Sequence, residues 1–304
     1  MGIDIHNLNF LAHAQDLGAR YERTLAIGRQ ALFIEPFELE AHRALRGLAP
    51  LQEPTTRAGE PRYFEPLMTQ WLGAAAAESV DASDYEDATY IHDMNLPWPD
   101  RSAQRGAFDA VLDFGCLEHV FNFPVAWRNV IDLCKVGGHV FHSLPANNLS
   151  GHGFYQFSPE LFFNLYQPQN GFELKGVWFA VKGDRLHWWQ VANPMEVKRR
   201  VNLCNGHEVY MLVLARKLRE VGPLPAPQQS DYAQDEWVTG PSAAVATAPT
   251  PTARQRLVRQ FAQWGWIDAL RAARERLRAV QRSGLDLPAP DYRRVDVHAL
   301  IRKT

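Results

Sequence analysis

Hydrophobic and polar positions between residues 107 and 145 follow a regular order along the chain. A nearly continuous apolar run over 107–112 stops at Gly115 and is typical of a buried parallel strand. Apolar positions at helical spacing follow over 125–133, and the Gly-Gly pair at 137–138 precedes the next apolar strand. This succession of strand, helix and strand predicts half of a doubly wound α/β fold.

Further segments extend the same sheet in both directions. Two short apolar runs upstream, at 79–83 and 88–91, are typical of strands. Downstream, residues 171–183 and 207–218 form two β-rich runs with alternating or continuous apolar positions. Together these segments predict a Rossmann-like, doubly wound α/β domain over residues 1–220.

The composition of the chain changes after residue 220. Residues 221–252 are rich in Pro, Ala, Ser and Gln, as extended linkers are. Residues 253–304 return to apolar positions at helical spacing and carry twelve basic and five acidic side chains, against 20 and 29 in the rest of the chain. We therefore expect a basic amphipathic helical tail. It could dock on its own domain, on a second subunit or on an anionic surface.

The strand-turn-helix segment resembles the class I S-adenosylmethionine-dependent methyltransferases. The likeness is carried by FDAV at 108–111, LEH at 117–119 and KVGG at 135–138. It implies S-adenosylmethionine as the cofactor and a mostly parallel, seven-stranded sheet whose last strand is antiparallel. In that arrangement, residues 171–183 and 207–218 would form the sixth and seventh strands.

Acidic residues follow two of the upstream strands. A carboxylate at the end of a strand, here Asp81, can accept both hydroxyls of a ribose. The resemblance implies that Asp93 binds the adenine amino group, that Met94 covers the ring, and that the turn after the fourth strand lies beside the methionine moiety. The expected cofactor contacts at these strand ends are Asp81, Ala82, Asp93, Met94, Phe114, Gly115 and Cys116. The alternative for both aspartates is that they cap turns.

The loop after the first strand departs from the family pattern. Family members carry an acid followed by G-x-G-x-G, whereas Gly28 is the single glycine here and Ala26 stands in the place of the acid. Arg29 and Gln30 are candidates to hold the cofactor carboxylate instead, because a guanidinium can bind a carboxylate through two hydrogen bonds. The alternative is that both are ordinary surface residues.

A second run of chemistry-bearing residues follows the fifth strand, at 145–160. Loops after the carboxyl ends of parallel strands line the ligand crevice of such folds. This loop is dense in hydrogen-bonding and aromatic side chains, which is typical of a substrate wall. The candidate substrate contacts are Asn147, Asn148 and Gln156. The alternative is that His152 and Asn148 hold the loop together through backbone hydrogen bonds.

Methyl transfer from a sulfonium depends mainly on positioning, because the leaving group is neutral. The protein can add a base that removes the acceptor's proton, and histidine suits this role. His152 on the loop is the first candidate and His119, beside Glu118, is the second. Tyr155 is a third candidate catalytic group. His142 and His187 are weaker candidates for the base.

The sequence predicts neither metal ligands nor disulfides. No H-x-x-x-H, H-x-H or C-x-x-C spacing occurs. The three cysteines, Cys116, Cys134 and Cys204, are too few and scattered for a disulfide framework and suit a reducing compartment. No run reaches the ~20 apolar residues of a membrane span, and no signal peptide is recognised, so a cytoplasmic protein is expected.

Three functions are compatible with these features. The first is methyl transfer to a small molecule or a sugar, at oxygen in our interpretation. The second is a catalytically silent relative that binds a partner, which the single glycine of the first loop suggests. The third, a nicotinamide-dependent oxidoreductase, is disfavoured because no G-x-G-x-x-G follows any strand. No nucleic-acid partner is expected, and the tail is a candidate for self-association or surface docking. The acceptor, the methylated atom and the oligomeric state are not encoded in these motifs.

Overall fold

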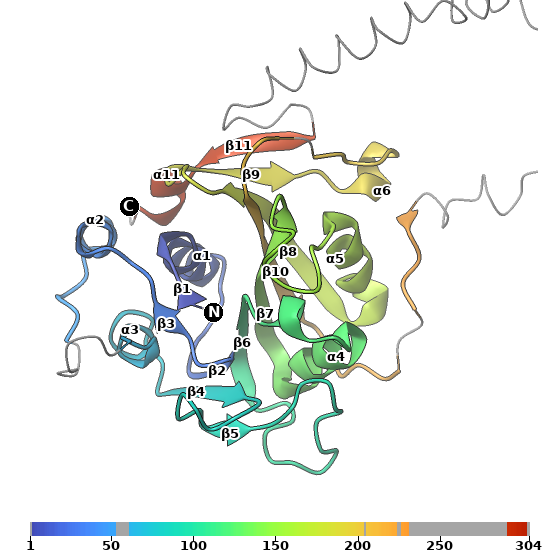
Figure 1. The fold of residues 1–304 in the computed structure, drawn as a ribbon, viewed down its shortest axis with the longest axis horizontal. Coiled ribbons are helices and arrows are strands. Elements are labelled where there is room, and N and C mark those ends of the chain that lie inside the picture. The colour runs from blue at the N-terminus through green and yellow to red at the C-terminus, as the bar shows by residue number, and fades with distance from the viewer. Residues whose placement is uncertain (1, 53–60, 204, 224–225, 231–290, 303–304) are drawn as a thin grey trace, which may run out of the picture.

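A single mixed β-sheet forms the centre of the protein. In a computed structural model, residues 2–52, 61–203, 205–223, 226–230 and 291–302 are described. The strands of the sheet are β2 (Arg23–Ile27), β4 (Ala76–Asp81), β5 (Tyr90–Ile91), β6 (Phe108–Phe114), β7 (Cys134–Asn147), β8 (Phe172–Val181), β9 (His187–Val191), β10 (Val209–Lys217) and β11 (Tyr292–Asp296). Their order across the sheet is β11-β9-β8-β10-β7-β6-β2-β4-β5 (Figure 1).

The direction of the strands follows the doubly wound pattern. Strands β5, β4, β2, β6 and β7 pair in parallel. Strand β10 lies between β7 and β8 and runs antiparallel to both. Among the seven strands from β5 to β8, β10 comes last in the chain and is antiparallel to its neighbours, as the resemblance implies. The prediction of seven strands was nevertheless too low, because β9 and β11 extend the sheet beyond β8 to nine strands.

Helices cover both faces of the sheet (Figure 1). On one face lie α1 (Ile5–Asp16), α2 (Pro36–Arg46), α3 (Glu65–Trp71) and α11 (Val297–Ile301), and on the other lie α4 (Phe123–Leu133) and α5 (Pro159–Leu165). The remaining short elements are β1 (Gly2–Ile3), β3 (Ala31–Leu32), η1 (Leu117–His119), η2 (Pro168–Asn170) and α6 (Pro194–Val197). Within the described residues, no helix has the length and apolar character needed to cross a membrane.

Strand β6 shows why the apolar run in the sequence is nearly continuous. All seven of its residues are buried, since helices lie on both sides of it. Val111 belongs to the hydrophobic cluster that contains α4 and α5, whereas Leu112 and Phe114 belong to the cluster that contains α1 and α3. Alternate side chains thus tie the strand to two cores, and each contributes about 1.5–3 kcal/mol through burial.

The parallel strands bring the candidate site together at one edge of the sheet. Asp81 ends β4, Phe114 ends β6 and Asn147 ends β7, and parallel strands end on the same side. Two glycines form the turns at this edge. Gly28 after β2 has a φ of 74° and Gly115 after β6 has a φ of 82°, backbone conformations that side chains disfavour.

The C-terminal part of the chain returns to the α/β domain. Strand β11 pairs antiparallel with β9, and α11 packs against α1 and α2. The guanidinium Nη1 of Arg46 in α2 donates to the carbonyl of Ile301, at 3.1 Å. The predicted helical tail at 253–304 is therefore corrected in its last part, where residues 292–296 form a strand. The five-residue segment YRRVD has no apolar alternation and was too short to be recognised as one. Residues 231–290, with most of the predicted linker and helix, lie outside the described residues.

A buried histidine links these N-terminal helices to the stability of the fold. His42 in α2 is 3% exposed, its Nδ1 lies 2.7 Å from Oδ1 of Asn9, and its ring stacks on Trp71. Burial is the main cause that lowers the pKa of His42 to about 4, and the charges of Arg46 and His298 add to it. The imidazole is therefore neutral in the folded protein at neutral pH.

Acidification is expected to destabilise the protein through His42. The unfolded chain takes up a proton near pH 6.5, whereas the folded chain resists it down to about pH 4. Stability from this group is thus complete above pH 6.5 and falls by up to about 3 kcal/mol as the pH is lowered toward 4. Urea unfolding at pH 7 and pH 4.5 of the wild type and of His42→Gln measures the difference. An equal loss of stability in both proteins would contradict this prediction.

Candidate functional site

The site begins at a buried aspartate near the end of β6. Asp113 is fully buried, and its Oδ1 accepts hydrogen bonds from the backbone N–H groups of Cys116 (3.2 Å) and Leu117 (3.1 Å). These bonds fix the turn through Gly115 and start the short helix η1. The backbone of Glu118 and His119, which η1 contains, is thereby set relative to the sheet edge.

The second oxygen of Asp113 starts a buried polar chain. Asp113 Oδ2 lies 2.7 Å from Nδ1 of His142 on β7, and Nε2 of His142 lies 2.6 Å from the hydroxyl of Tyr166. The indole N–H of Trp127 donates to the same hydroxyl at 3.0 Å. When Nδ1 of His142 donates to Asp113, its Nε2 accepts from the hydroxyl of Tyr166, so each contact in this chain has a donor and an acceptor. His142 is fully buried and engaged at both nitrogens, so it is excluded as the base.

Glu118 carries the most unusual side chain of the site. Its side chain is completely buried, and within the described residues neither carboxylate oxygen has a hydrogen-bond partner. Burial, followed by the charge of Asp113, raises the pKa of Glu118 to about 8. A buried polar group without a hydrogen-bond partner destabilises the folded protein. The unpaired carboxyl of Glu118 therefore indicates a place where a ligand or a proton binds.

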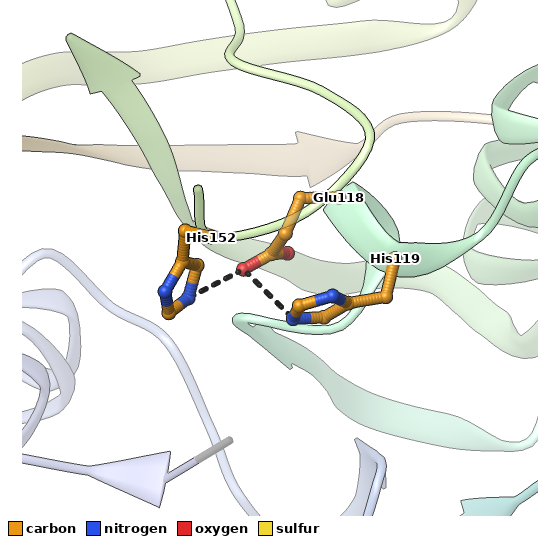
Figure 2. A group of neighbouring side chains, drawn as sticks. All are labelled: Glu118, His119 and His152. Carbon is orange, nitrogen blue, oxygen red and sulfur yellow. Dashed lines mark ion pairs between the residues drawn. The ribbon is translucent and has the colours of Figure 1, made fainter. Parts of the chain in front are cut away.

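Two histidines converge on this carboxylate. His152 Nε2 lies 3.5 Å from Glu118 Oε1, and His119 Nε2 lies 3.8 Å from the same oxygen. Figure 2 shows the two imidazole rings approaching that oxygen from different directions, with His119 coming from η1 and His152 from the loop after β7. Both histidines remain partly exposed, at 46% and 41% of the side chain. Burial, and then the charge of His152, lowers the pKa of His119.

The backbone of the loop after β7 is attached directly to Glu118. The N–H groups of Phe154 and Tyr155 both donate to the carbonyl of Glu118, at 2.8 and 3.3 Å. A Cβ on Gly153 would lie 2.9 Å from that carbonyl oxygen, which is too close for any other residue. The glycine in the GHGFY run is therefore required for the loop to pack on η1. This packing holds His152 beside the carboxylate.

A cavity of about 250 Å³ lies next to His152. Its walls come from the start of the chain and the ends of the strands, and its polar lining includes Asp4, His6, Asn7, Ser143 and Tyr210. Gly115 and Phe114 also line it, so the cavity reaches the turn where the cofactor's methionine moiety is expected. A small acceptor bound there would lie beside His152.

The other predicted loop residues make contacts within the protein. Asn148 donates to the carbonyl of His207 at 2.6 Å, and Asn147 donates to the side-chain oxygen of Asn205 at 3.1 Å. Gln156 accepts from the backbone N–H of Leu149 at 2.8 Å. The hydroxyl of the third candidate catalytic residue, Tyr155, donates to the carbonyl of Phe121 at 2.6 Å. Of these contacts, the one made by Asn148 agrees with the alternative for that side chain, in which it holds the loop through a backbone hydrogen bond.

The acidic residues at the upstream strand ends make local contacts. Asp81 Oδ1 accepts from the N–H of Ala82 at 2.7 Å, and the residue remains partly exposed at the end of β4. Asp93 Oδ1 accepts from both the backbone and the side-chain nitrogen of Asn95, each at 2.8 Å. Met94 is 5% exposed and belongs to a hydrophobic cluster. Asp93 thus caps a turn in this structure.

The residues of the first loop are likewise engaged. The N–H of Gly28 donates to the carbonyl of Val80 at 2.7 Å, which joins the loop to β4. Arg29 Nε pairs with Glu65 at 2.7 Å, and Gln30 is buried and donates to the carbonyl of Ile27 at 2.8 Å. Neither side chain is the ordinary surface residue that the alternative assumed.

The turn after β6 combines packing with close approach. Phe114 is 2% exposed and packs on Phe10 of α1, with ring centroids 6.4 Å apart. A Cβ on Gly115 would lie 3.3 Å from Glu118 Oε1, so the glycine also makes room for the carboxylate. Burial is the main cause that raises the pKa of the Cys116 thiol well above its ordinary value. A raised pKa disfavours the thiolate, which is the reactive form of a cysteine.

Two residues central to this geometry were not among the predicted site residues. Asp113 was hidden inside an apolar strand, although a charged residue in such a run is itself a signal of a buried polar contact. Glu118 was noted only as the neighbour of His119. His152 is 34 residues from Glu118 in the chain. No short sequence motif therefore predicts that the two side chains are close together.

No family model and no curated protein matches the chain. Among solved structures, the trans-methyltransferase CalH in complex with SAH is 16% identical with a TM-score of 0.33, and the match covers 69% of this chain but only 54% of CalH. The [4+2]-cyclase SpnF is 14% identical with a TM-score of 0.36, over 71% of this chain and 81% of SpnF.

A third similar structure comes from Thermotoga maritima. It is a SAM-dependent methyltransferase described as a possible histamine N-methyltransferase, 14% identical with a TM-score of 0.34. The match covers 71% of this chain and 91% of that one.

Proposed function

We propose that the protein transfers a methyl group from S-adenosylmethionine to an acceptor. The observation that carries the proposal is the order of the sheet, in which five parallel strands are followed by the antiparallel β10 inserted between β7 and β8. The motifs FDAV, LEH and KVGG support the same proposal, and they fall on β6, η1 and the start of β7.

The cofactor would lie across the carboxyl ends of β2, β4 and β6. The strand order reverses between β2 and β6, and ligands bind at such a switch point. Asp81 at the end of β4 would accept the ribose hydroxyls, and Gly28 and Gly115 would let the backbone approach the cofactor closely. Asp93 and Met94 are proposed for the adenine, which requires Asp93 to exchange its contact with Asn95.

The acceptor would bind in the cavity beside His152 and attack the methyl carbon in line. An oxygen–carbon bond forms while the carbon–sulfur bond breaks, and the electron pair of that bond stays on sulfur to give neutral S-adenosylhomocysteine. The hydroxyl proton of the acceptor leaves to His152, which lines the cavity and has a partly exposed imidazole. A small molecule or a sugar hydroxyl fits a cavity of about 250 Å³. A cytoplasmic location is part of the same proposal.

The second candidate function is a silent relative that binds a partner. It is favoured by the first loop, where Arg29 is already paired with Glu65 and Gly28 is the single glycine. Calorimetric titration with S-adenosylmethionine separates the two candidates, with NADH as the comparison for an oxidoreductase. Binding of S-adenosylmethionine without binding of NADH supports the methyltransferase. Absence of S-adenosylmethionine binding to the folded protein contradicts it.

Replacing Asp81 with alanine is expected to weaken binding of S-adenosylmethionine. The ribose hydroxyls would lose a charged acceptor, which is worth about 1.5–3 kcal/mol, or roughly 10- to 150-fold in affinity. Calorimetry measures the change, with Asp84→Ala as the matched control in the same loop. An unchanged affinity in folded Asp81→Ala would remove this residue from the ribose site.

A further inference from the structure

The carboxylate of Glu118 is buried, yet the described residues around it offer it no hydrogen bond. The side chain has 0% exposure, and both oxygens lack a hydrogen-bond partner within the described part of the chain. The Nε2 nitrogens of His119 and His152 lie 3.8 and 3.5 Å from Oε1. These separations are too long for good hydrogen bonds. They are, however, the separations expected when several ligands share one central atom.

We propose that Glu118, His119 and His152 bind a divalent transition-metal ion of the Zn²⁺ class. One ligand atom from each residue lies within 4.8 Å of the others. Metal–ligand bonds of about 2.0–2.2 Å place neighbouring ligands roughly 3–4 Å apart, so small movements of the two histidines complete the site. Imidazole suits zinc, iron, copper and nickel, whereas calcium and magnesium prefer oxygen ligands alone.

The backbone around the three ligands is held from two sides. Asp113 fixes the turn into η1 through two backbone N–H groups, and the N–H groups of Phe154 and Tyr155 attach the second loop to the carbonyl of Glu118. Metal sites depend on such outer contacts to orient their ligands. The charge of a bound cation would also stabilise the ionised carboxylate, which burial alone disfavours.

Three protein ligands leave a coordination position open, as catalytic zinc sites do. Because His152 also lines the cavity of about 250 Å³, we infer that this position is directed toward the cavity and takes an acceptor hydroxyl. The cation would lower the pKa of that hydroxyl and favour loss of its proton. This last step rests on the proposed methyl transfer, whereas metal binding itself does not. In the metal-bound protein, His152 acts as a ligand and the proton leaves to solvent.

Cobalt titration of the full chain tests the site. After dialysis against a chelator, Co²⁺ is expected to bind once per chain and to give visible absorption bands of a low-coordinate nitrogen and oxygen site. Glu118→Gln and His152→Gln should each weaken binding by more than about 100-fold, since the loss of an outer contact alone costs roughly 10–100-fold. His298→Gln on α11 is the matched control and should bind like the wild type.

Two results would overturn the metal site: no Co²⁺ binding by the wild type, or equal binding by folded Glu118→Gln and His152→Gln. Circular dichroism establishes that each variant is folded, and His119→Gln provides an exposed ligand change if the buried one fails to fold. Calorimetry with S-adenosylmethionine on the same samples keeps the two proposals apart. Loss of cofactor binding with intact Co²⁺ bands would contradict methyl transfer alone, and the reverse would contradict the metal site alone.

Discussion

Replacing His152 with alanine is expected to lower the turnover of methyl transfer by about 10²- to 10⁴-fold. His152 is the partly exposed imidazole that both lines the cavity and lies 3.5 Å from the buried Glu118. Affinity for S-adenosylmethionine should remain close to that of the wild type, because every proposed cofactor contact lies on other elements. Steady-state kinetics with an identified acceptor and calorimetry with the cofactor measure the two effects.

The matched control for this prediction is Asn148→Ala in the same loop. Its amide donates to the carbonyl of His207, so its loss should lower thermal stability more than turnover. Near-normal turnover of His152→Ala, together with a lower melting temperature, would make His152 structural and His119 the next candidate. A base and a metal ligand both predict lost turnover. The Co²⁺ absorption of the variant distinguishes them.

Replacing Asp113 with alanine is expected to destabilise the protein by about 3–5 kcal/mol. The carboxylate is fully buried and accepts from two backbone N–H groups and contacts His142, and each buried group that loses this partner costs about 1–3 kcal/mol. Urea unfolding of the variant measures the loss. Tyr166→Phe is the control at the other end of the chain of hydrogen bonds, and about 1–3 kcal/mol is expected there. A loss below about 1 kcal/mol for Asp113→Ala would show that these bonds contribute little.

Much of the sheet could be predicted because its strands are buried on both faces. The uninterrupted apolar run of β6 and the Gly-Gly pair at 137–138 are direct consequences of that burial. The predictions of an α/β fold and of an antiparallel seventh strand agree with the structure. The ninth strand could not be predicted, because β11 is a short edge strand with exposed arginines, and its pairing with β9 spans about a hundred residues.

The candidate site was harder to predict for a different physical reason. His152 and His119 were recognised one by one, but their meeting depends on Gly153, which lets the loop backbone reach the carbonyl of Glu118. Helices and strands give a regular spacing of apolar residues in the sequence, but contacts between the side chains of a loop and another element do not. The prediction of no metal ligands relied on local spacing alone, and such spacing is absent when a ligand arrives from a distant loop. Whether the predicted cofactor residues bind the cofactor stays a prediction.

The hydrogen bond between Arg46 and Ile301 joins a helix made early in translation to one made at the end of the described chain. The two residues are separated by 255 positions, and a ribosome adds about 5–20 residues per second. Roughly 13–50 seconds therefore pass between synthesis of Arg46 and synthesis of Ile301, and α11 cannot cover α1 and α2 during this time. During that interval the nascent chain presents an incomplete apolar surface.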